Sequence, residues 1–323
     1  MSLDLQYPAD SSSRAEWIVA QRPRRNQLAP DRPYAFFVED EYSAAGEIVP
    51  VATIFLTNRE CPWRCVMCDL WKNTGTAPTE PGSIPHQIEY ALERLPAARE
   101  IKLYNSGSFF DAQAIPPQDY RAIANLVQAF ERVIVECHPS LVGSRTFAFQ
   151  DLLEHPLEVA MGLETAHPEV LEKLNKGMTL DQYATAARTL RAHGADLRVF
   201  LLVQPPFMRP EETLSWTRRS LDFAFKCGAT AASLIPTRGG NGAMETLAQI
   251  NVFSPPSLKV LEDNMEYGLS LKHGRVFADL WDLSRNAPRC ASCWPARIER
   301  LRKMNLTQSA QEPVACMQCE GLS

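Results

Sequence analysis

The chain of 323 residues is long enough for one large or two ordinary domains, and its 45% hydrophobic and 22% charged residues are ordinary for a globular protein. A formal net charge of −5 and a pI near 5.8 argue against a generally basic nucleic-acid binder. No basic start followed by an apolar run heads the sequence, and no stretch of about 18 apolar residues occurs, so we expect no secretory signal, no membrane span and a cytoplasmic location.

The pattern along the chain predicts an alternation of strands and helices. Residues 1–45 are rich in Pro, Arg and Ser, and we expect them to form an irregular arm. Near-continuous apolar runs, typical of a parallel sheet covered on both faces, predict strands over 51–57, 101–104, 132–137, 157–163, 197–203 and 231–236. Helical patterns occupy 83–95, 118–130, 179–193, 211–227 and 256–272. This order predicts an α/β core over 46–280, either a (β/α)6 partial barrel or an open doubly wound sheet, with function at the carboxyl ends of the strands.

Seven of the nine cysteines fall in three tight groups. In a reducing compartment such groups favour metal or catalytic roles over disulfides. Cys137 and Cys227 stand alone, and we expect both to be small buried hydrophobic side chains.

The first group follows the predicted strand 51–57 and has the spacing Cys61-x3-Cys65-x2-Cys68. Structural zinc normally takes four ligands, so a lone trio is a poor zinc site. A [4Fe–4S] cube takes four thiolates, and three would leave one iron open to chelate the amino and carboxylate groups of a ligand. The alternatives are a structural metal loop or three unrelated thiols.

This trio, placed after the first strand, resembles the signature of the radical SAM superfamily. The resemblance implies a (β/α)6 partial TIM barrel, a [4Fe–4S] cluster on Cys61, Cys65 and Cys68, and S-adenosylmethionine (SAM) chelated by the fourth iron. It also implies a one-electron donor such as a flavodoxin or ferredoxin, whose electron cleaves SAM to a 5′-deoxyadenosyl radical that abstracts hydrogen from a substrate. Met67 stands where the superfamily often has an aromatic residue that packs on adenine.

Further motifs at the predicted strand ends match SAM contacts in the same superfamily. Asn105, Ser106 and Gly107 follow the second strand, where the superfamily usually has a Gly-Gly-Glu type loop beside the SAM amino group. Taken alone, these three residues could equally form a simple turn.

Two carboxylates and a lysine complete the expected SAM site. Glu136 and Glu164 end the third and fourth predicted strands, where an unpaired charge is costly in a packed core. The motif Asn175-Lys176-Gly177 resembles an element of the branch that contains Elongator's catalytic subunit and oxygen-independent coproporphyrinogen oxidase. By that resemblance Glu136 and Glu164 contact the SAM amino group and ribose, and Lys176 its carboxylate; the alternative is ordinary surface salt bridges.

The loop after the sixth predicted strand contains Arg238 and Asn241 among three glycines that let backbone approach a ligand. It is expected either to contact substrate or adenosine or to be a plain flexible loop. The order Tyr-Asn-Ser-Gly-Ser-Phe, Gly-Leu-Glu-Thr, Asn-Lys-Gly and Pro-Pro-Phe also resembles the archaeosine-synthesis radical SAM proteins over roughly residues 50–275. The compact C-x3-C spacing and the Arg-Gly-Gly-Asn-Gly loop depart from them, so the likeness implies a shared fold and SAM chemistry but not the same tRNA substrate.

The resemblance to radical SAM proteins also suggests which substrates to expect. A modified nucleoside in tRNA is the first substrate expectation, and a small metabolite or peptide is close behind. A non-catalytic, metal-stabilised RNA-binding protein is the alternative from another class.

The segment 281–323 holds the other four clustered cysteines, Cys290-x2-Cys293 and Cys316-x2-Cys319. Two such pairs predict a closed four-thiolate metal site, occupied by Zn²⁺ or by an auxiliary [4Fe–4S] cluster. Basic residues gather around them, and they either bind RNA phosphate or form the solvated face of a helix over 296–304: Arg285, Arg289, Arg297, Arg300, Arg302 and Lys303.

Overall fold

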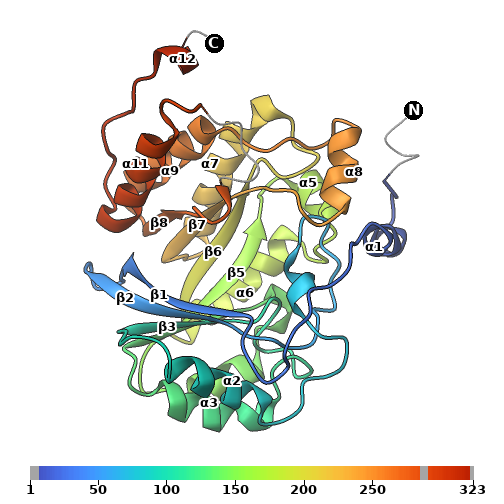
Figure 1. The fold of residues 1–323 in the computed structure, drawn as a ribbon, viewed down its shortest axis with the longest axis vertical. Coiled ribbons are helices and arrows are strands. Elements are labelled where there is room, and N and C mark those ends of the chain that lie inside the picture. The colour runs from blue at the N-terminus through green and yellow to red at the C-terminus, as the bar shows by residue number, and fades with distance from the viewer. Residues whose placement is uncertain (1–6, 284–289, 321–323) are drawn as a thin grey trace.

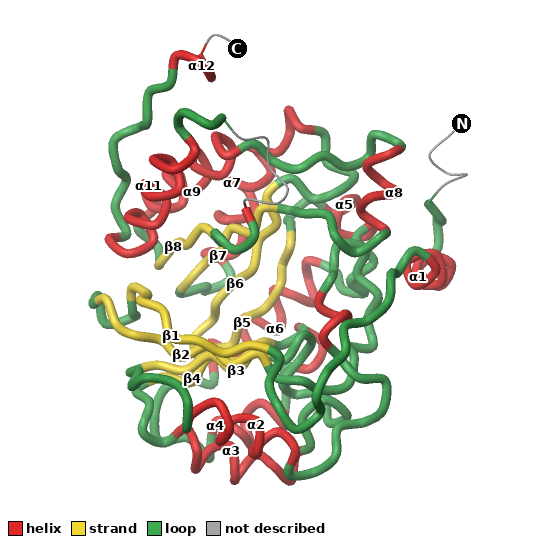
Figure 2. The backbone as a smooth tube through the Cα atoms, in the orientation of Figure 1, coloured by secondary structure: helices red, strands yellow, loops and turns green. Residues whose placement is uncertain are grey.

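The computed structural model describes residues 7–283 and 290–320, and eight strands in them form one sheet (Figures 1 and 2). The strands neighbour one another in chain order: β1 (Ala35–Tyr42), β2 (Ile48–Phe55), β3 (Glu100–Tyr104), β4 (Arg132–Glu136), β5 (Leu157–Glu164), β6 (Asp196–Val203), β7 (Ala231–Pro236) and β8 (Arg275–Ala278). β1 runs antiparallel to β2, and every later pair is parallel.

The sheet curls into a partial barrel. The rings of Tyr104 in β3 and Phe200 in β6 lie 6.1 Å apart, although β4 and β5 stand between these strands. A flat sheet would hold strands three positions apart about 14 Å away from each other, so this contact requires strong curvature. The inner face of the sheet therefore lines a lumen.

Helices pack on the outer face of the sheet and at the ends of its strands (Figure 1). They are α1 (Ser11–Ala20), α2 (Ser83–Leu92), α3 (Tyr120–Val127), α4 (Ser144–Gln150), α5 (Pro168–Lys173), α6 (Leu180–Ala192), α7 (Pro210–Lys226), α8 (Ala243–Gln249), α9 (Leu258–Leu271), α11 (Trp294–Thr307) and α12 (Met317–Glu320). Three short 3-10 helices are η2 (Leu70–Asn73), η3 (Pro117–Asp119) and η4 (Pro139–Leu141). None of the described helices is both long and apolar enough to cross a bilayer.

Local sequence explains where these helices begin and end, as α6 illustrates. Thr179 and Gln182 exchange hydrogen bonds between side chain and backbone, which satisfies free N–H groups of the first turn. The helix ends before Gly194, whose φ of +79° few other residues tolerate. Tyr183 and Leu190 face the sheet and are fully buried. The main core is formed in this way, between helix faces and the outward-facing strand residues.

The amino ends of the strands close the lumen with a buried layer of charges, which we call the barrel floor. It comprises Glu41, Lys102, Glu158, Arg198 and Arg275. The fully buried Glu158 accepts from Arg198 Nε at 2.6 Å and from Arg275 Nη2 at 2.6 Å. Glu41 accepts from Arg198 Nη2 at 2.6 Å and also pairs with Lys102. Burial raises the pKa of Glu158, but the arginines lower it further, to about 2.

Helix α11 covers the free edge of β8. Asn305 donates to the carbonyl of Ala278 at 2.9 Å and accepts from its N–H at 2.8 Å. Gln308 pairs in the same way with Val276, at 3.0 and 2.7 Å. These two carboxamides satisfy backbone groups that an edge strand otherwise leaves open. The barrel's packing therefore continues past the expected boundary at 280, as far as residue 308.

The α/β partial barrel predicted from the sequence is confirmed, and its six strands are β2–β7. The expectation of an irregular arm over 1–45 is wrong, since α1 and β1 lie in it. Three consecutive acidic residues, Glu39, Asp40 and Glu41, hide the alternation of β1, and Glu41 is paired only through cations on other strands. β8, which the sequence pattern also missed, is only four residues long.

Candidate active site

The cysteine trio lies on the loop that follows β2, which we call the cysteine loop (residues 58–69). Cys61, Cys65 and Cys68 are each partly buried at the carboxyl end of the barrel. Burial is the main cause that raises the pKa of each thiol to about 12. A bound metal would reverse this preference, because the thiolate is the form that ligates metal.

Two segments far away in the chain hold the cysteine loop, residues 174–175 and Asn241. Asn175 donates its amide to the carbonyl of Arg64 at 3.1 Å, and the N–H of Val66 donates to the carbonyl of Leu174 at 3.0 Å. Asn241 donates to the carbonyls of Val66 at 2.7 Å and Cys68 at 3.1 Å. The loop is therefore anchored through its own backbone, at Arg64, Val66 and Cys68 within the span of the trio.

Asn241 thus lies under the cysteine loop and not in the open loop predicted to contact substrate. Its side chain is 2% exposed, and its oxygen accepts from the N–H of Met244 at 2.8 Å. Since both ends of the carboxamide are occupied, Asn241 positions the cysteines. The predicted ligand contact through Asn241 does not fit this arrangement.

A stack between Trp63 of the cysteine loop and His138, which follows β4, was not predicted from the sequence. The rings of Trp63 and His138 lie 3.6 Å apart at an interplanar angle of 11°. His138 donates from Nε2 to the carbonyl of Lys176 at 3.0 Å and accepts from the N–H of Ser140 at Nδ1. Burial first, and then the charge of Lys176, lower the pKa of His138 to about 3, so the ring is neutral. Gly177 is required here, since a Cβ would lie 2.9 Å from Trp63.

Glu164 and Lys176, predicted as SAM contacts, form a buried ion pair of 2.5 Å between Oε1 and Nζ. Burial lowers the pKa of Lys176, but Glu164 first and then Cys65 raise it above its ordinary value. Glu164 has a φ of +64° at an irregularity of β5, and a Cβ on Gly162 would lie within 2.5 Å of both charged atoms. A strained backbone at such a place is typical of functional sites.

Glu136 lies beside the predicted loop 105–107. Its carboxylate accepts from the N–H of Asn105 at 2.5 Å and of Gly107 at 3.4 Å. Burial raises its pKa to about 7 against the opposing effect of these amides. The carboxamide of Asn105 is buried and has no hydrogen-bond partner among the described residues. Ser106, at φ +55°, shares a hydrogen bond of 3.0 Å with the hydroxyl of Tyr34.

Residues of the supposed arm also support the cysteine loop. Glu60, next to Cys61, is paired with Arg22 at 2.7 Å, with Arg64 at 3.1 Å and with Arg25. No motif in the sequence pointed to this cluster. The only signal in the sequence for this cluster of ion pairs was the concentration of arginines near the N-terminus.

Met67 is partly buried and packs on a second apolar cluster beneath α1 and α8, which includes Val66, Leu174 and Met244. Its proposed contact with adenine stays a prediction.

A group of aromatic side chains, the aromatic collar, lines the lumen between the floor and the cysteine loop. Phe55 lies 5.9 Å from Tyr104, 6.0 Å from Phe37 and 6.1 Å from Trp281 by ring centroids, and Tyr104 reaches Phe200. Trp281 is 49% exposed and the other four are half-buried. The collar therefore presents ring surface to whatever enters the lumen.

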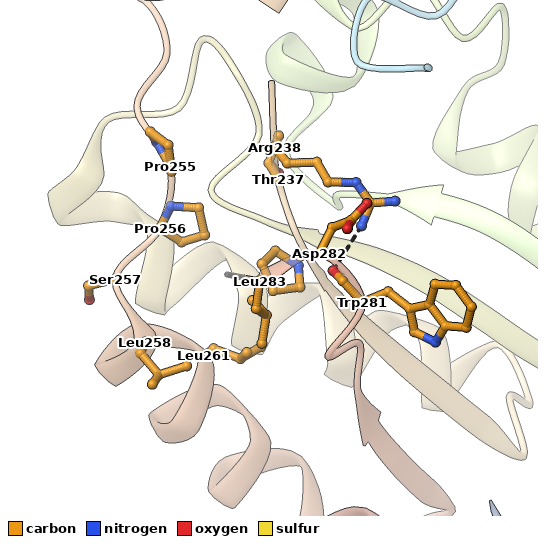
Figure 3. A pocket seen from close by; sticks show the side chains of 11 residues that line it. Thr237, Arg238, Pro255, Pro256, Ser257, Leu258, Leu261, Trp281, Asp282 and Leu283 are labelled. Carbon is orange, nitrogen blue, oxygen red and sulfur yellow. Dashed lines mark hydrogen bonds between the residues drawn. The ribbon is translucent and has the colours of Figure 1, made fainter. Parts of the chain in front are cut away.

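Arg238 lies beside the collar (Figure 3). Its guanidinium donates to the carbonyl of Trp281 at 3.2 Å and stands 3.7 Å from the carboxylate of Asp279. Arg238 and Trp281 border a shallow pocket, whose other walls come from the end of β7, from Pro255 to Leu261 and from Asp282 and Leu283. Contact of Arg238 with a ligand stays a prediction.

The four C-terminal cysteines come together, as their spacing predicts. The sulfurs of Cys290, Cys293, Cys316 and Cys319 all lie within 4.8 Å of one another. The group is able to hold a metal ion.

The basic residues nearby are mostly engaged within the protein. Arg297 pairs with Glu262 on α9, and Arg300 pairs with Glu266. Arg302 is exposed and pairs with Glu299. Arg285 and Arg289 lie outside the described residues. The helix predicted over 296–304 is part of α11, and its Arg297 and Arg300 pack on acidic side chains, whereas Arg302 and Lys303 are exposed.

The donor set at the carboxyl ends fits the groups that the resemblance implies. Three thiols on one loop match three corners of a [4Fe–4S] cube and leave its fourth iron without a protein thiolate. A buried lysine beside two of the thiols supplies positive charge for a carboxylate. The unpartnered carboxamide of Asn105 offers both a donor and an acceptor.

A curled parallel barrel with three cysteines on the loop after its first parallel strand defines a class of enzyme. The chain belongs to the Radical SAM superfamily, whose sequence model matches residues 55–217, just over half of the chain. Enzymes of this superfamily use a [4Fe–4S] cluster and SAM.

Two archaeal relatives cover most of the chain. An uncharacterized protein of Methanocaldococcus jannaschii is 24% identical over 318 aligned positions, and the match covers 92% of this chain and 87% of that protein. An archaeosine synthase subunit beta of Methanosarcina acetivorans is 26% identical over 290 aligned positions, and the match covers 84% of this chain and 83% of the relative.

Solved structures show weaker similarity. Methylornithine synthase covers 97% of this chain and 91% of its own, with 11% identity and a TM-score of 0.44. The Elp3 of Methanocaldococcus infernus covers 60% and 51%, with 15% identity and a TM-score of 0.47. The barrel assignment rests on the strand order and curvature of this chain itself.

Proposed function

We propose that this radical SAM enzyme modifies a nucleoside of tRNA. The observation that carries the proposal is the relationship, over more than four fifths of both chains, to a protein named archaeosine synthase subunit beta. Archaeosine is a modified tRNA nucleoside. The aromatic collar supports the same substrate class, because half-buried rings in the lumen offer stacking surface to a planar base.

In this proposal each group of site residues has its own role. Cys61, Cys65 and Cys68 hold the cluster, which when bound supplies the electron that cleaves SAM to methionine and a 5′-deoxyadenosyl radical. Lys176 meets the carboxylate of SAM and is held in place by Glu164 at 2.5 Å. Glu136 and the backbone at 105–107 form the opposite side of the SAM site.

Substrate enters the lumen beneath the SAM site in this proposal. A base stacked in the collar lies among charged groups, because Arg238 and Asp279 stand beside Trp281. Burial raises the pKa of Asp279, and Arg238 opposes that shift. A base in a helical stem of the RNA has to unstack before it enters the lumen, which costs about a few kcal/mol. This cost is smallest for a base in a loop.

The first experiment measures 5′-deoxyadenosine from SAM with anaerobically reconstituted protein and dithionite. Its control is the Cys61/Cys65/Cys68→Ala variant, which should give none. Adding unfractionated tRNA should raise the yield and change the mass of one nucleoside after digestion. A flavodoxin or ferredoxin should replace dithionite.

The substrate proposal has its own control. Phe55→Ala should lower turnover of tRNA but leave the slow cleavage of SAM without substrate unchanged, because the collar contacts only substrate. The tRNA proposal would be overturned if the yield of 5′-deoxyadenosine did not change when tRNA is added but rose when a pool of small metabolites or peptides is added. The assignment of SAM cleavage would still hold.

A further inference from the structure

The four-cysteine group at the C-terminus has a geometry that distinguishes one metal ion from a cluster. The sulfurs of Cys290 and Cys316 lie 3.7 Å apart, and so do those of Cys293 and Cys319. Among the described residues this is the one group of such ligand atoms that gathers within 4.8 Å. We propose that it is a mononuclear structural zinc site and not a second iron–sulfur cluster.

Bond lengths give the reason. Four sulfurs placed tetrahedrally around one zinc at about 2.3 Å stand about 3.8 Å from one another. The thiolates of a [4Fe–4S] cube bind four different iron atoms and stand about 6 Å apart. The observed 3.7 Å separations match the first arrangement, and the 4.8 Å limit on all pairs excludes the second without movement of both segments.

Little besides a metal explains why these segments meet. Helix α12 has four residues and lies away from the barrel, beyond α11 (Figure 1). Its Met317 is 90% exposed, and no described residue of α12 belongs to an apolar core cluster. Ser292 and the thiol of Cys290 donate to the side-chain oxygen of Gln318, at 2.9 and 3.4 Å. A four-residue helix is too short to be stable by itself.

The position of the site gives it a structural purpose. Cys293 immediately precedes α11, the helix whose Asn305 and Gln308 cover the edge of β8. Arg300 of the same helix donates to the carbonyls of Gln311 and Glu312 and so holds the returning chain. A metal bound by both Cys pairs joins the segment before α11 to the segment that follows it. This link fixes the start of α11. With four protein ligands no position remains for substrate.

The test is a metal count on protein purified without oxygen from cells supplied with both iron and zinc. In the Cys61/Cys65/Cys68→Ala background we expect about one zinc per chain and no iron. Adding Cys290→Ser and Cys316→Ser should remove that zinc, while Cys227→Ser, a lone half-buried thiol, should leave it unchanged. Replacement by Co²⁺ should give the visible bands of a tetrahedral tetrathiolate site.

Two results would overturn the proposal. One is about four irons per chain, with a cluster absorption that dithionite bleaches, in the variant that lacks the barrel cysteines. The other is metal-free protein whose four C-terminal thiols are oxidised to disulfides. If the barrel variant fails to fold, the reconstituted wild type decides the matter, because about four irons together with one zinc support the zinc site and about eight irons contradict it.

Discussion

The amino and carboxyl ends of the barrel both contain buried carboxylates and cations, but these groups have different roles at the two ends. At the floor, every carboxylate faces cations on other strands, and burial of Glu158 is outweighed by its arginines, which lower its pKa to about 2. At the carboxyl end, Glu136 accepts hydrogen bonds from backbone amides, and burial raises its pKa to about 7 against these amides and the charge of Lys176. Paired charges close the floor, and incompletely paired groups lie where ligands are expected.

Backbone geometry shows the same contrast. Glu164 ends β5, Gln204 directly follows β6 and Ser106 is the second residue after β3, and each has a φ between +55° and +64°. Residues in this region cost of order 1–3 kcal/mol and persist only where the surroundings enforce them. The carboxyl end thus holds residues in strained backbone conformations at the ends of three strands.

The largest expected effect separates chemistry from stability. Cys65→Ser should lose most of the barrel iron and lower SAM cleavage by more than about 10⁴-fold, because a cube held by two thiolates is not retained. Chemical unfolding of the iron-free proteins should be unchanged, since the floor is intact. Iron content, 5′-deoxyadenosine and a urea melt measure the three quantities. Cys227→Ser is the control, and retained cleavage in Cys65→Ser would contradict the cluster assignment.

The opposite end should show the opposite result. Glu158→Gln removes the charge partner of the buried Arg275 and one of the two partners of Arg198, and should reduce the free energy of unfolding by about 3 kcal/mol. In the wild type, this stabilisation is present above the ordinary pKa of 4.5 and is lost as pH falls toward about 2. The variant should lack that acid-dependent loss in urea melts at several pH values. Glu154→Gln, on an exposed side chain, should change neither.

Lys176→Ala tests the carboxyl end without removing the cluster. The change should weaken SAM binding by about 10²-fold, because a charge-assisted contact to a carboxylate contributes roughly 1.5–3 kcal/mol. Iron content should stay at the wild-type level. Equilibrium dialysis of SAM on reconstituted protein measures the first quantity. Lys173→Ala, an exposed neighbour, serves as control, and normal SAM affinity in Lys176→Ala would show that the role assigned to this lysine is wrong.

The smallest expected effect concerns the stacked pair. His138→Phe preserves a ring against Trp63 but removes the hydrogen bond to the carbonyl of Lys176, worth about 1 kcal/mol. Iron should leave the protein several-fold faster in the presence of a chelator, with little change in cleavage rate once the cluster is intact. His138→Ala removes the stack as well and should release iron faster still. Equal rates in all three proteins would show that the stack does not hold the loop.

Sequence reasoning succeeded where the signal is local. The spacing of Cys61, Cys65 and Cys68 lies within eight residues of one loop, and the six apolar runs of β2–β7 report burial on both faces of a sheet. The two C-terminal cysteine pairs are equally local, and their meeting followed from ligand number. β1 escaped prediction because its acidic residues find their cations only on β3 and β6.

By itself, then, the sequence determined the class of fold, the trio and the four C-terminal thiols, because short spacings and apolar runs depend on neighbours along the chain. Only the tertiary structure decided the stack of Trp63 on His138 and the role of Asn241, which reaches across 175 residues to Val66. It also decided that Glu158 is stabilised in its charged form. These features depend on which strand ends meet when the sheet curls, and no periodicity in the chain encodes that distance.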